Sequence, residues 1–369
     1  MSNLAIYRKY RPKTFSDVLG QEMITKILKE AAKENKLSHA YLFTGPRGTG
    51  KTTTARLIAK VANCEKRQED EKFRKKGEPC NECEACKNID SGRCLDIIEI
   101  DAASNRGIDE IRNLRENVKV PPSSNPYKVF IIDEAHMLTK DAFNALLKTL
   151  EEPPEYIILI LATTETEKIP STISSRTQQF HFKLVPLQEV VEKLKNIVEK
   201  EDIKISNEAL ELIASSAEGS FRDAESLLDQ FVSSGDKEIT VEEIEGMIGE
   251  VGFDKINEVA KALLKNDLDQ ALNIISKIED NGYNLAQFNK SLIKHLRQTA
   301  VLSFTPTMEK VFSKKLTKDH LNKIKKNAER FEKKHLKLLK SLISSYEQMR
   351  YSQFPIIPLE ISIIEGLKK

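Results

Sequence analysis

The residues best suited to chemistry form a glycine-rich loop followed by a lysine and a threonine. The run Gly45-Pro-Arg-Gly-Thr-Gly-Lys-Thr52 matches the pattern G-x-x-x-x-G-K-[ST] and stands between an expected strand and an expected helix. Glycines let backbone amides turn toward phosphates, and the helix that follows directs its positive end at them. The pattern predicts an ATP and Mg²⁺ site in which Lys51 meets the β and γ phosphates and Thr52 ligates the metal. The predicted contacts are Gly45, Arg47, Gly48, Thr49, Gly50, Lys51, Thr52 and Thr53.

A second acidic motif ends another apolar strand about 80 positions later, at Asp133 and Glu134. Strand ends in parallel sheets face the ligand crevice, so these carboxylates are expected beside the phosphates. Asp133 would hold Mg²⁺ through water, and Glu134 would polarise the attacking water, which predicts a hydrolase. The alternative for Glu134 is a helix cap, and His136 is expected to be structural or a modest orienter.

Hydroxyls and arginines supply further candidates. Thr163 and Thr164 close the next apolar strand, where a polar group can orient the attacking water. Arg176 follows a predicted helix, and Arg222 lies in Gly219-Ser-Phe-Arg-Asp-Ala, which opens another. Both arginines are candidates for the γ-phosphate, although a single arginine is more often a surface residue.

Four of the five cysteines form the pattern C-x15-C-x2-C-x2-C. Closely spaced thiolates in a polar insertion suit tetrahedral Zn²⁺ and have no apolar core to justify their burial. We expect a closed structural site at Cys64, Cys80, Cys83 and Cys86, with an iron–sulfur cluster as the minor alternative. Cys94 is left over and is expected to be a buried thiol.

The bulk composition places few limits on function. The chain has 369 residues, a net charge of +2, 40% hydrophobic and 31% charged residues, which suits two or three globular domains. The near-neutral total argues only against non-selective coating of DNA, because charge can still concentrate locally. The charged start argues against a signal peptide, and the longest apolar run, Tyr156–Ala162, is too short to span a bilayer. We therefore expect a cytoplasmic protein without membrane contact.

Hydrophobic patterns predict an α/β region followed by an all-α region. Four runs read as central strands of a parallel sheet, and a helix is predicted over Asp141–Glu152. The strand signals stop after Pro186, and we place a further boundary near Ser234–Asp236, before a capping box at Thr240–Glu243. The predicted strands are Leu42–Thr44, Ile97–Ile100, Val129–Ile132 and Ile157–Ala162.

Taken together, these motifs resemble the γ/τ subunits of bacterial DNA polymerase III, the clamp-loader ATPases of the AAA+ superfamily. The resemblance covers most of the first 230 residues. It includes Tyr7-Arg-Lys-Tyr-Arg-Pro12, Phe15, Gly20-Gln21, the run from His39 to Thr52, the cysteine cluster, Glu99–Ser104, Asp133-Glu134, Ser175-Arg176 and Gly219–Ala224.

The resemblance implies an AAA+ module over residues 1–179 with a zinc-binding insertion at about 62–95, a helical lid over 180–236 and a helical collar for oligomerisation over 237–369. It implies that Thr164 is the sensor-1 residue, Arg222 the sensor-2 arginine and Arg176 an arginine finger acting in a neighbouring subunit. The segment from Arg11 to Gly20, with Arg11, Pro12 and Val18, would cradle the adenine.

The same resemblance implies how the chain works and with what. ATP binding would align a ring of this chain, further copies of it and subunits of the delta and delta-prime type, and the ring would hold an open sliding clamp. Primer–template DNA would enter, and hydrolysis would release the closed clamp. A polymerase label would belong to the holoenzyme, because no nucleotide-transfer carboxylates are seen beyond the ATP site.

Three features depart from the family pattern. Thr177 stands where the family often has cysteine, the spacing between Cys64 and Cys80 is longer than usual, and the chain ends at Lys369, just after the collar. The last feature leads us to expect either a form of γ length or a shortened chain.

Two other functions fit parts of the sequence. Another AAA+ remodeller, such as a branch-migration motor, shares the P-loop and sensors but should carry a winged helix in place of an all-α C-terminus. An ATP-switched scaffold would resemble degenerate loader subunits, and the intact set of Lys51, Thr52, Asp133 and Glu134 argues against it.

Overall fold

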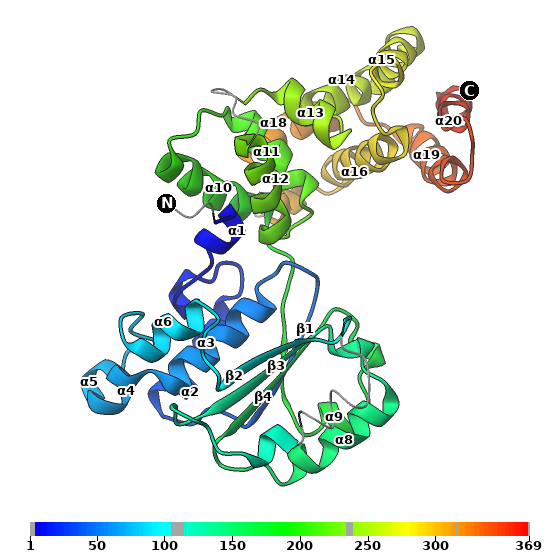
Figure 1. Cartoon of the computed structure of the whole chain (residues 1–369). Helices are drawn as coiled ribbons and strands as arrows, with labels where there is room; N and C mark the ends of the chain where they lie inside the picture. The colour runs from blue at the N-terminus through cyan, green and yellow to red at the C-terminus, as the bar shows by residue number, and fades with distance from the viewer. Residues whose placement is uncertain (1–3, 105–113, 115, 234–238, 314–315, 368–369) are drawn as a thin grey trace. The chain divides into compact units, whose positions relative to one another are not determined.

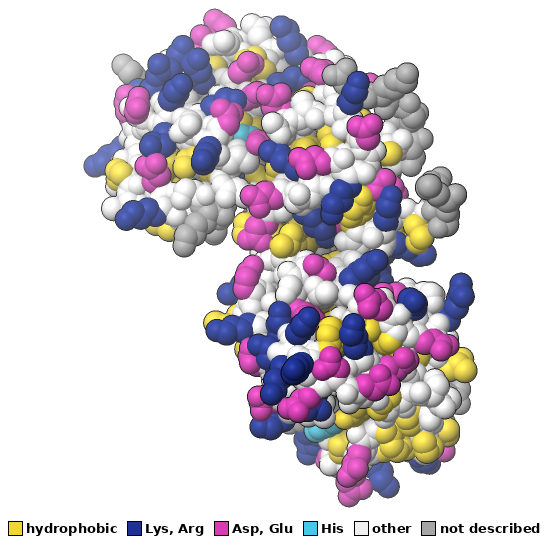
Figure 2. Space-filling model, turned by 90° about the vertical axis from the view of Figure 1, so that its left-hand side faces the viewer, with side chains coloured by type: hydrophobic (Ala, Val, Ile, Leu, Met, Phe, Trp, Pro, Cys, Tyr) yellow, Lys and Arg dark blue, Asp and Glu magenta, His cyan; other side chains and the backbone are white. Residues whose placement is uncertain are grey.

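The computed structural model describes residues 4–104, 114, 116–233, 239–313 and 316–367. It contains two compact units, Met1–Val185 with Gly219–Asp223, and Pro186–Glu218 with Ala224–Lys369. The boundary that we predicted at residues 234–236 lies outside the described residues. Figure 2 shows basic and acidic side chains interspersed over the visible face, in keeping with the near-neutral net charge.

The first unit is built on a parallel sheet with the order β2-β3-β4-β1-β5. Its strands are β1 (Ala40–Thr44), β2 (Ile97–Asp101), β3 (Lys128–Asp133), β4 (Ile157–Thr163) and β5 (Gln178–His181). The four predicted strands are confirmed to within two residues at each end. β5 was not predicted from the sequence, because it is an edge strand in which only Phe180 is buried.

Helices cover both faces of this sheet, as Figure 1 shows. Alternate residues of β1 divide between two cores, because successive strand residues point to opposite faces. Tyr41 and Phe43 pack with α2 (Glu22–Lys33) and α3 (Lys51–Asn63), whereas Leu42 packs with α8 (Lys140–Glu151). The helix predicted over Asp141–Glu152 is confirmed, and it begins and ends one residue earlier than predicted.

Short elements complete the first unit. Three of them, α4, α5 and α6, form the cysteine-bearing insertion between α3 and β2, and α6 packs on α3. The bounds are α1 (Ile6–Lys9), η1 (Phe15–Asp17), α4 (Glu65–Glu69), α5 (Glu71–Arg74), α6 (Glu84–Asp90), η2 (Ala135–Met137), η3 (Thr166–Lys168) and α9 (Ser171–Ser174).

The second unit is helical throughout its described residues apart from one isolated bridge between Ile205 and Ile239. Its largest core joins α14, α15, α16, α19 and α20, and the predicted capping box at Thr240 and Glu243 opens α13. The bounds are α10 (Leu187–Glu201), α11 (Asn207–Ser216), α12 (Phe221–Ser233), α13 (Val241–Ile248), α14 (Phe253–Leu264), α15 (Leu268–Asp280), α16 (Leu285–Phe304), η4 (Pro306–Met308), α17 (Glu309–Phe312), α18 (Lys318–Ala328), α19 (His335–Met349) and α20 (Ile356–Leu367). Among the described helices, none has both the length and the apolar character needed to cross a membrane.

Candidate nucleotide and metal sites

The glycine-rich loop joins the end of β1 to the start of α3. A side chain at Gly45 would place its Cβ 2.2 Å from the carbonyl oxygen of Phe182, so this position admits only glycine. Gly48 has a φ of 72° and packs against Ser220 in the segment that precedes α12. Both positions therefore require glycine, because each has a positive φ and a close neighbour, the Phe182 backbone at Gly45 and the Ser220 side chain at Gly48.

Lys51 is buried at the first position of α3. Its Nζ donates to the carbonyl oxygens of Gly45 and Pro46, at 2.7 Å each. Burial lowers the pKa of the ammonium group, although the charges of Glu134 and Asp133 act in the opposite direction. The side chain thus lies over the loop that we expect to hold phosphates, in a region that also contains the two carboxylates.

The hydroxyl and carboxylate residues predicted for catalysis lie together at one edge of the sheet. β1, β3 and β4 run parallel and in register, so their carboxyl ends meet at that edge. Thr52 Oγ1 donates to Asp133 Oδ2 at 2.7 Å, and Thr164 Oγ1 donates to Glu134 Oε2 at 3.1 Å. The backbone amide of Glu134 donates to Asp133 Oδ1 at 2.9 Å and links the two pairs, so the four residues form one hydrogen-bonded arrangement.

His136 lies between two carboxylates. Its Nδ1 is 3.1 Å from Thr163 Oγ1 and 3.4 Å from Glu134 Oε2, and its Nε2 is 3.1 Å from Glu165 Oε1. Its side chain is only 8% exposed, so these neighbours fix the ring. Glu134 adopts a left-handed φ of 48° directly after β3, which is unusual for a residue with a side chain. That His136 is structural or a modest orienter stays a prediction.

Arg222 lies with the first unit although the chain has already entered the second. The segment Gly219–Asp223 belongs to the first unit, and the guanidinium of Arg222 lies 5.4 Å from the ring centroid of Tyr7. Burial lowers the pKa of Arg11, and the neighbouring charges of Arg56 and Arg222 lower it further. Arg11, Arg56 and Arg222 thus form a basic group, in which Arg56 pairs with Glu99 and Arg222 lies beside Gly48.

The structure does not bring Arg176 to the other candidates by any contact among the described residues. Its guanidinium is bonded to the carbonyl oxygen of Thr172 at 2.9 Å and to Glu151 at 2.9 Å. The side chain is 37% exposed at the end of α9. The ion pair with Glu151 holds the side chain close to α8 of its own chain.

The segment expected to cradle the adenine reaches the glycine-rich loop through Val18. This side chain is buried, and its Cγ1 lies 3.9 Å from the position of a Cβ on Gly50. Arg11 and Pro12 are half-buried. Arg47 is exposed and Thr53 half-buried, while the hydroxyl of Thr49 donates to the carbonyl oxygen of Pro46 at 2.8 Å and stabilises the loop itself.

The four predicted cysteine ligands come together in space. All four Sγ atoms lie within 4.8 Å of one another, and Cys80 Sγ is 3.9 Å from Cys86 Sγ. Tetrahedral Zn²⁺ with bonds of about 2.3 Å separates its sulfurs by about 3.8 Å, so this donor set fits the metal. A hydrogen bond from Cys86 lowers the pKa of Cys64 to about 5, while the pKa of Cys86 is raised.

Cys94, the fifth cysteine, lies outside the four-sulfur cluster. Cys94 is half-buried rather than buried, because it lies in the exposed turn before β2, where it accepts from Asn125 Nδ2 at 3.2 Å.

Glu165 and Glu78 were not among the predicted site residues. Glu165 has a weak sequence signal, since it follows the Thr163-Thr164 strand end. Glu78 has none beyond its place two residues before Cys80.

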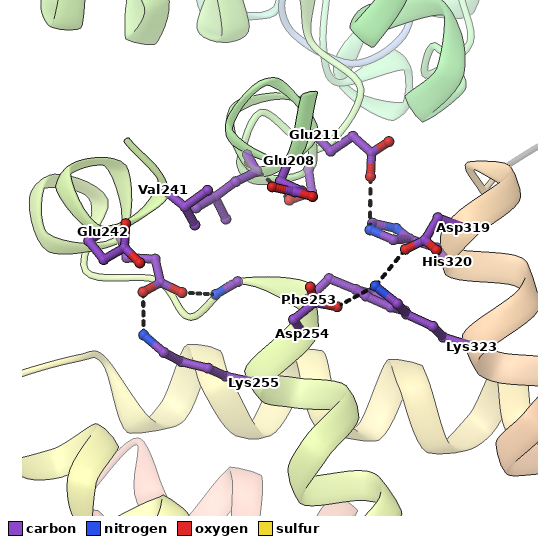
Figure 3. Close-up of a pocket in the computed structure, with 14 residues that line it drawn as sticks. Glu208, Glu211, Val241, Glu242, Phe253, Asp254, Lys255, Asp319, His320 and Lys323 are labelled. Carbon is purple, nitrogen blue, oxygen red and sulfur yellow. Dashed lines mark hydrogen bonds and ion pairs between the residues drawn. The ribbon is translucent and has the colours of Figure 1, made fainter. Parts of the chain in front are cut away.

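The second unit contains a pocket of about 270 Å³ between α11, α13, α14 and α18 (Figure 3). Carboxylates and basic groups in it pair with one another: Glu211 with His320, Asp254 with Lys323, and Glu245 with Lys255. His320 also stacks on Phe253 with ring centroids 3.6 Å apart. These pairs satisfy one another and give the pocket the character of a packed polar junction.

The fold and the site define a class of protein, and comparisons with known proteins show the family. The parallel sheet, the glycine-rich loop and the carboxylates at the neighbouring strand end define a P-loop nucleotide-binding protein. Three family models match: "DNA polymerase III, delta subunit" over residues 20–186, "DNA polymerase III clamp loader subunit, ATPase lid domain" over 189–237 and "DNA polymerase III subunits gamma and tau domain III" over 239–367. The chain belongs to the family of DNA polymerase III gamma and tau subunits.

Curated relatives show the extent of the match. DNA polymerase III subunit gamma of Buchnera aphidicola subsp. Schizaphis graminum is 36% identical over 100% of this chain and 99% of its own length. Subunit tau of Bacillus subtilis is 43% identical over 99% of this chain, and subunit tau of Escherichia coli is 39% identical over 83%. The chain spans 63% and 46% of the length of these two tau subunits.

Among solved structures, the Holliday junction branch migration motor RuvB of Thermotoga maritima aligns with a TM-score of 0.46 at 20% identity. The alignment covers 69% of this chain and 79% of that one. This similarity is too distant to carry an argument about function.

Proposed function

We propose that this chain is the ATP-hydrolysing motor subunit of a clamp loader that acts in the cytoplasm. The observation that carries the proposal is the hydrogen-bonded arrangement of Thr52, Asp133, Glu134 and Thr164 beside Lys51. A protein that only binds ATP needs the loop and a Mg²⁺ ligand, whereas a hydrolase also needs a carboxylate placed to polarise water.

Each residue has a role in this proposal. Lys51 binds the β and γ phosphates, Thr52 and Asp133 hold Mg²⁺, and the bound metal supplies charge neutralisation at the phosphates. Glu134 accepts the proton of the attacking water, and Thr164 and His136 orient that carboxylate. Arg222 contacts the γ-phosphate within the same chain, while Arg11, Pro12 and Val18 contact the adenine. The remaining loop contacts are Gly45, Arg47, Gly48, Thr49, Gly50 and Thr53.

Arg176 is proposed to complete the site of a neighbouring subunit. Its exposed position and its lack of any contact with the loop in the described chain support this role. An arginine supplied by a partner raises the rate of phosphoryl transfer by about 10³–10⁵, so the isolated chain should hydrolyse ATP slowly. Hydrolysis would then be controlled by assembly with subunits of the delta and delta-prime type, further copies of this chain, the sliding clamp and primer–template DNA.

Three working parts are proposed: an AAA+ module over 1–179, a lid over 180–236 and a collar for oligomerisation over 237–369. The ranges matched by the family models support this division. Cys64, Cys80, Cys83 and Cys86 are proposed to hold a structural Zn²⁺, which the sulfur spacing supports.

The test is steady-state ATPase activity of the chain alone and after mixing with clamp, the other loader subunits and primed DNA. We expect strong stimulation that Arg176→Ala removes, while Arg93→Ala, an exposed arginine in the insertion, leaves it intact. High basal activity that ignores these partners would overturn the loader function and favour a remodeller. If the assembled complex showed no turnover above background and Glu134→Gln left that background unchanged, the ATP-switched scaffold would replace the motor.

A further inference from the structure

Glu78 connects the cysteine insertion to the N-terminal segment of the chain. Its carboxylate accepts from the backbone amides of Phe15 at 2.7 Å and Ser16 at 3.1 Å, and from the Ser16 hydroxyl at 2.8 Å. The Glu78 side chain is only 13% exposed. Hydrogen bonds to a shielded carboxylate are stronger than those between neutral groups, so this contact holds η1 firmly.

Further contacts fix the insertion to α2, beside η1. Lys29 Nζ lies 2.9 Å from both Glu78 Oε1 and Ser16 Oγ. Gly77, with a φ of 70°, approaches so closely that a Cβ there would lie 2.5 Å from the carbonyl oxygen of Lys29. From α4, Arg67 Nη2 donates to the carbonyl oxygen of Ala32 at 2.7 Å, at the end of α2. The insertion therefore grips α2 at two places.

Glu78 lies close in the chain to the cysteine cluster, and the residues that it binds lie close in the chain to Val18. Two residues after it comes Cys80, whose amide donates to Cys64 Sγ at 3.4 Å and whose thiol lies in the four-sulfur cluster. On the other side of the contact, η1 leads within one residue to Val18, which packs beside Gly50 of the glycine-rich loop. A short path of fixed groups thus runs from the cysteine cluster to the edge of the nucleotide site.

We infer that Glu78 is a positioning residue that couples the metal-bound cysteine cluster to the adenine-binding segment, so that metal occupancy raises nucleotide affinity. The inference rests on the proposed function for the identity of the nucleotide and of the metal. When all four thiolates are held, Cys80 fixes the backbone that carries Glu78, and Glu78 fixes Phe15 and Ser16. When they are released, the segment samples other positions and binds only in the fraction of molecules that retain the native one.

Coupling of this kind works in both directions. If metal occupancy raises nucleotide affinity by some factor, nucleotide must raise metal affinity by the same factor. ADP should therefore tighten Zn²⁺ binding, measured in competition with a chelator, and a chain without the Glu78 carboxylate should lose this effect. This readout is independent of ATP hydrolysis and of the other loader subunits.

The experiment compares the full chain with Glu78→Ala, Glu78→Gln and the matched control Glu82→Ala. Glu82 is an exposed carboxylate of the same insertion whose side chain pairs only loosely with Lys66, at 3.5 Å. Calorimetric titration gives the Kd for ADP and for GDP, metal analysis gives the Zn²⁺ content, and equilibrium competition with a chromogenic chelator gives the Zn²⁺ affinity with and without ADP.

We expect Glu78→Ala to keep its Zn²⁺ and to bind ADP about three- to tenfold more weakly, as it would if the competent fraction fell by that factor. The loss should be larger for ADP than for GDP, Glu78→Gln should recover part of it, and ADP should no longer raise the Zn²⁺ affinity of Glu78→Ala.

Equal ADP affinity in the wild-type and Glu78→Ala chains, or equal losses for Glu78→Ala and Glu82→Ala, would overturn the coupling and leave the proposed function standing. A metal-loaded wild-type chain that binds no ADP at all would overturn both. The variants that retain Zn²⁺ decide the question.

Discussion

At the scale of single residues, the contacts of His136 distinguish a side chain that positions a catalytic group from one that only fills space. The ring is bounded by Thr163 and Glu165 and reaches Glu134, so it restricts where the Glu134 carboxylate can lie. In the proposed mechanism that carboxylate must meet a water molecule in line with the γ-phosphate, and small displacements of such a group reduce the rate strongly.

We therefore predict that His136→Ala lowers kcat of the assembled, DNA-stimulated ATPase by about ten- to a hundredfold with little change in KM. His136→Gln retains a hydrogen-bonding group and should recover part of the activity. Steady-state kinetics with purified partners measures both parameters. An unchanged kcat for His136→Ala, with ATP affinity also unchanged, would show that the ring has no positioning role.

At the scale of elements, the start of α12 and the glycine-rich loop depend on each other's shape. A Cβ on Gly48 would lie 1.8 Å from Ser220 Oγ, whereas Gly92, with nearly the same φ (69° against 72°), has nothing within 4 Å of its Cβ position. The two glycines thus share the conformational strain of an alanine substitution but differ in the steric clash.

Gly92→Ala is the matched control for the effect of Gly48→Ala on stability. Gly48→Ala should lower the free energy of unfolding of the first unit by about 1–3 kcal/mol more than Gly92→Ala does, because overpacking adds to the strain. It should also weaken ATP binding, which Gly92→Ala should leave unchanged. Denaturant unfolding measures the loss of stability, and nucleotide titration measures the loss of ATP affinity. Equal losses in stability for the two variants would show that the loop and the start of α12 accommodate the added Cβ without a steric penalty.

In the second unit, His295 of α16 makes the helical core sensitive to acid. The side chain is 3% exposed, its Nε2 lies 3.2 Å from Asn327 Nδ2, and its ring lies beside Phe253. Burial, with a smaller contribution from His320, lowers the pKa of His295 to about 4. The unfolded chain takes up this proton near pH 6.5, whereas the folded chain does so only near the lowered value.

Protonation of His295 therefore leaves the free energy of unfolding unchanged above about pH 6.5. This free energy falls as the pH falls from 6.5 toward 4, because the unfolded state then binds more protons than the folded state. The loss is on the order of 3 kcal/mol. His295→Gln should flatten the pH dependence of unfolding of the second unit without abolishing it, because burial also lowers the pKa of His335. Chemical denaturation across this pH range provides the measurement, and an unaltered slope in the variant would contradict the assignment.

The elements also show what a sequence can reveal. The strands that the pattern predicted are those with long apolar runs, and β5 was missed because Gln178–His181 is an edge strand with polar residues on its exposed positions. Motif spacing located Lys51, Asp133 and Glu134, because strand ends in a parallel sheet share an edge. The contact of Glu78 with Phe15 joins residues 63 positions apart and leaves no periodic signal, so only the fold could reveal it.

At the scale of the whole molecule, the two compact units should respond differently to loss of metal. The cysteine cluster and every contact that we describe around it belong to the first unit. A change of 1 kcal/mol shifts the melting temperature of a unit of this size by about 2–4 °C. Zn²⁺ removal should therefore lower the melting temperature of the first unit by several degrees.

The second unit should melt at an unchanged temperature in the same scan. Differential scanning calorimetry before and after chelation tests this expectation, with readdition of Zn²⁺ as the control for reversibility. A shift of both transitions by the same amount would show that the units do not unfold independently. If neither transition moved, the cysteine cluster would contribute nothing to stability.

The first unit is also discontinuous in the chain, since Gly219–Asp223 joins it after residues 186–218 have passed through the second. During synthesis at about 5–20 residues per second, residue 223 follows residue 185 by roughly 2–8 s. For that interval a nascent chain carries the sheet, the glycine-rich loop and α3 without the segment that packs on Gly48. The proposed ATP site would therefore be completed only after the first helices of the second unit have been made, and a translational pause before residue 219 would prolong its incomplete form.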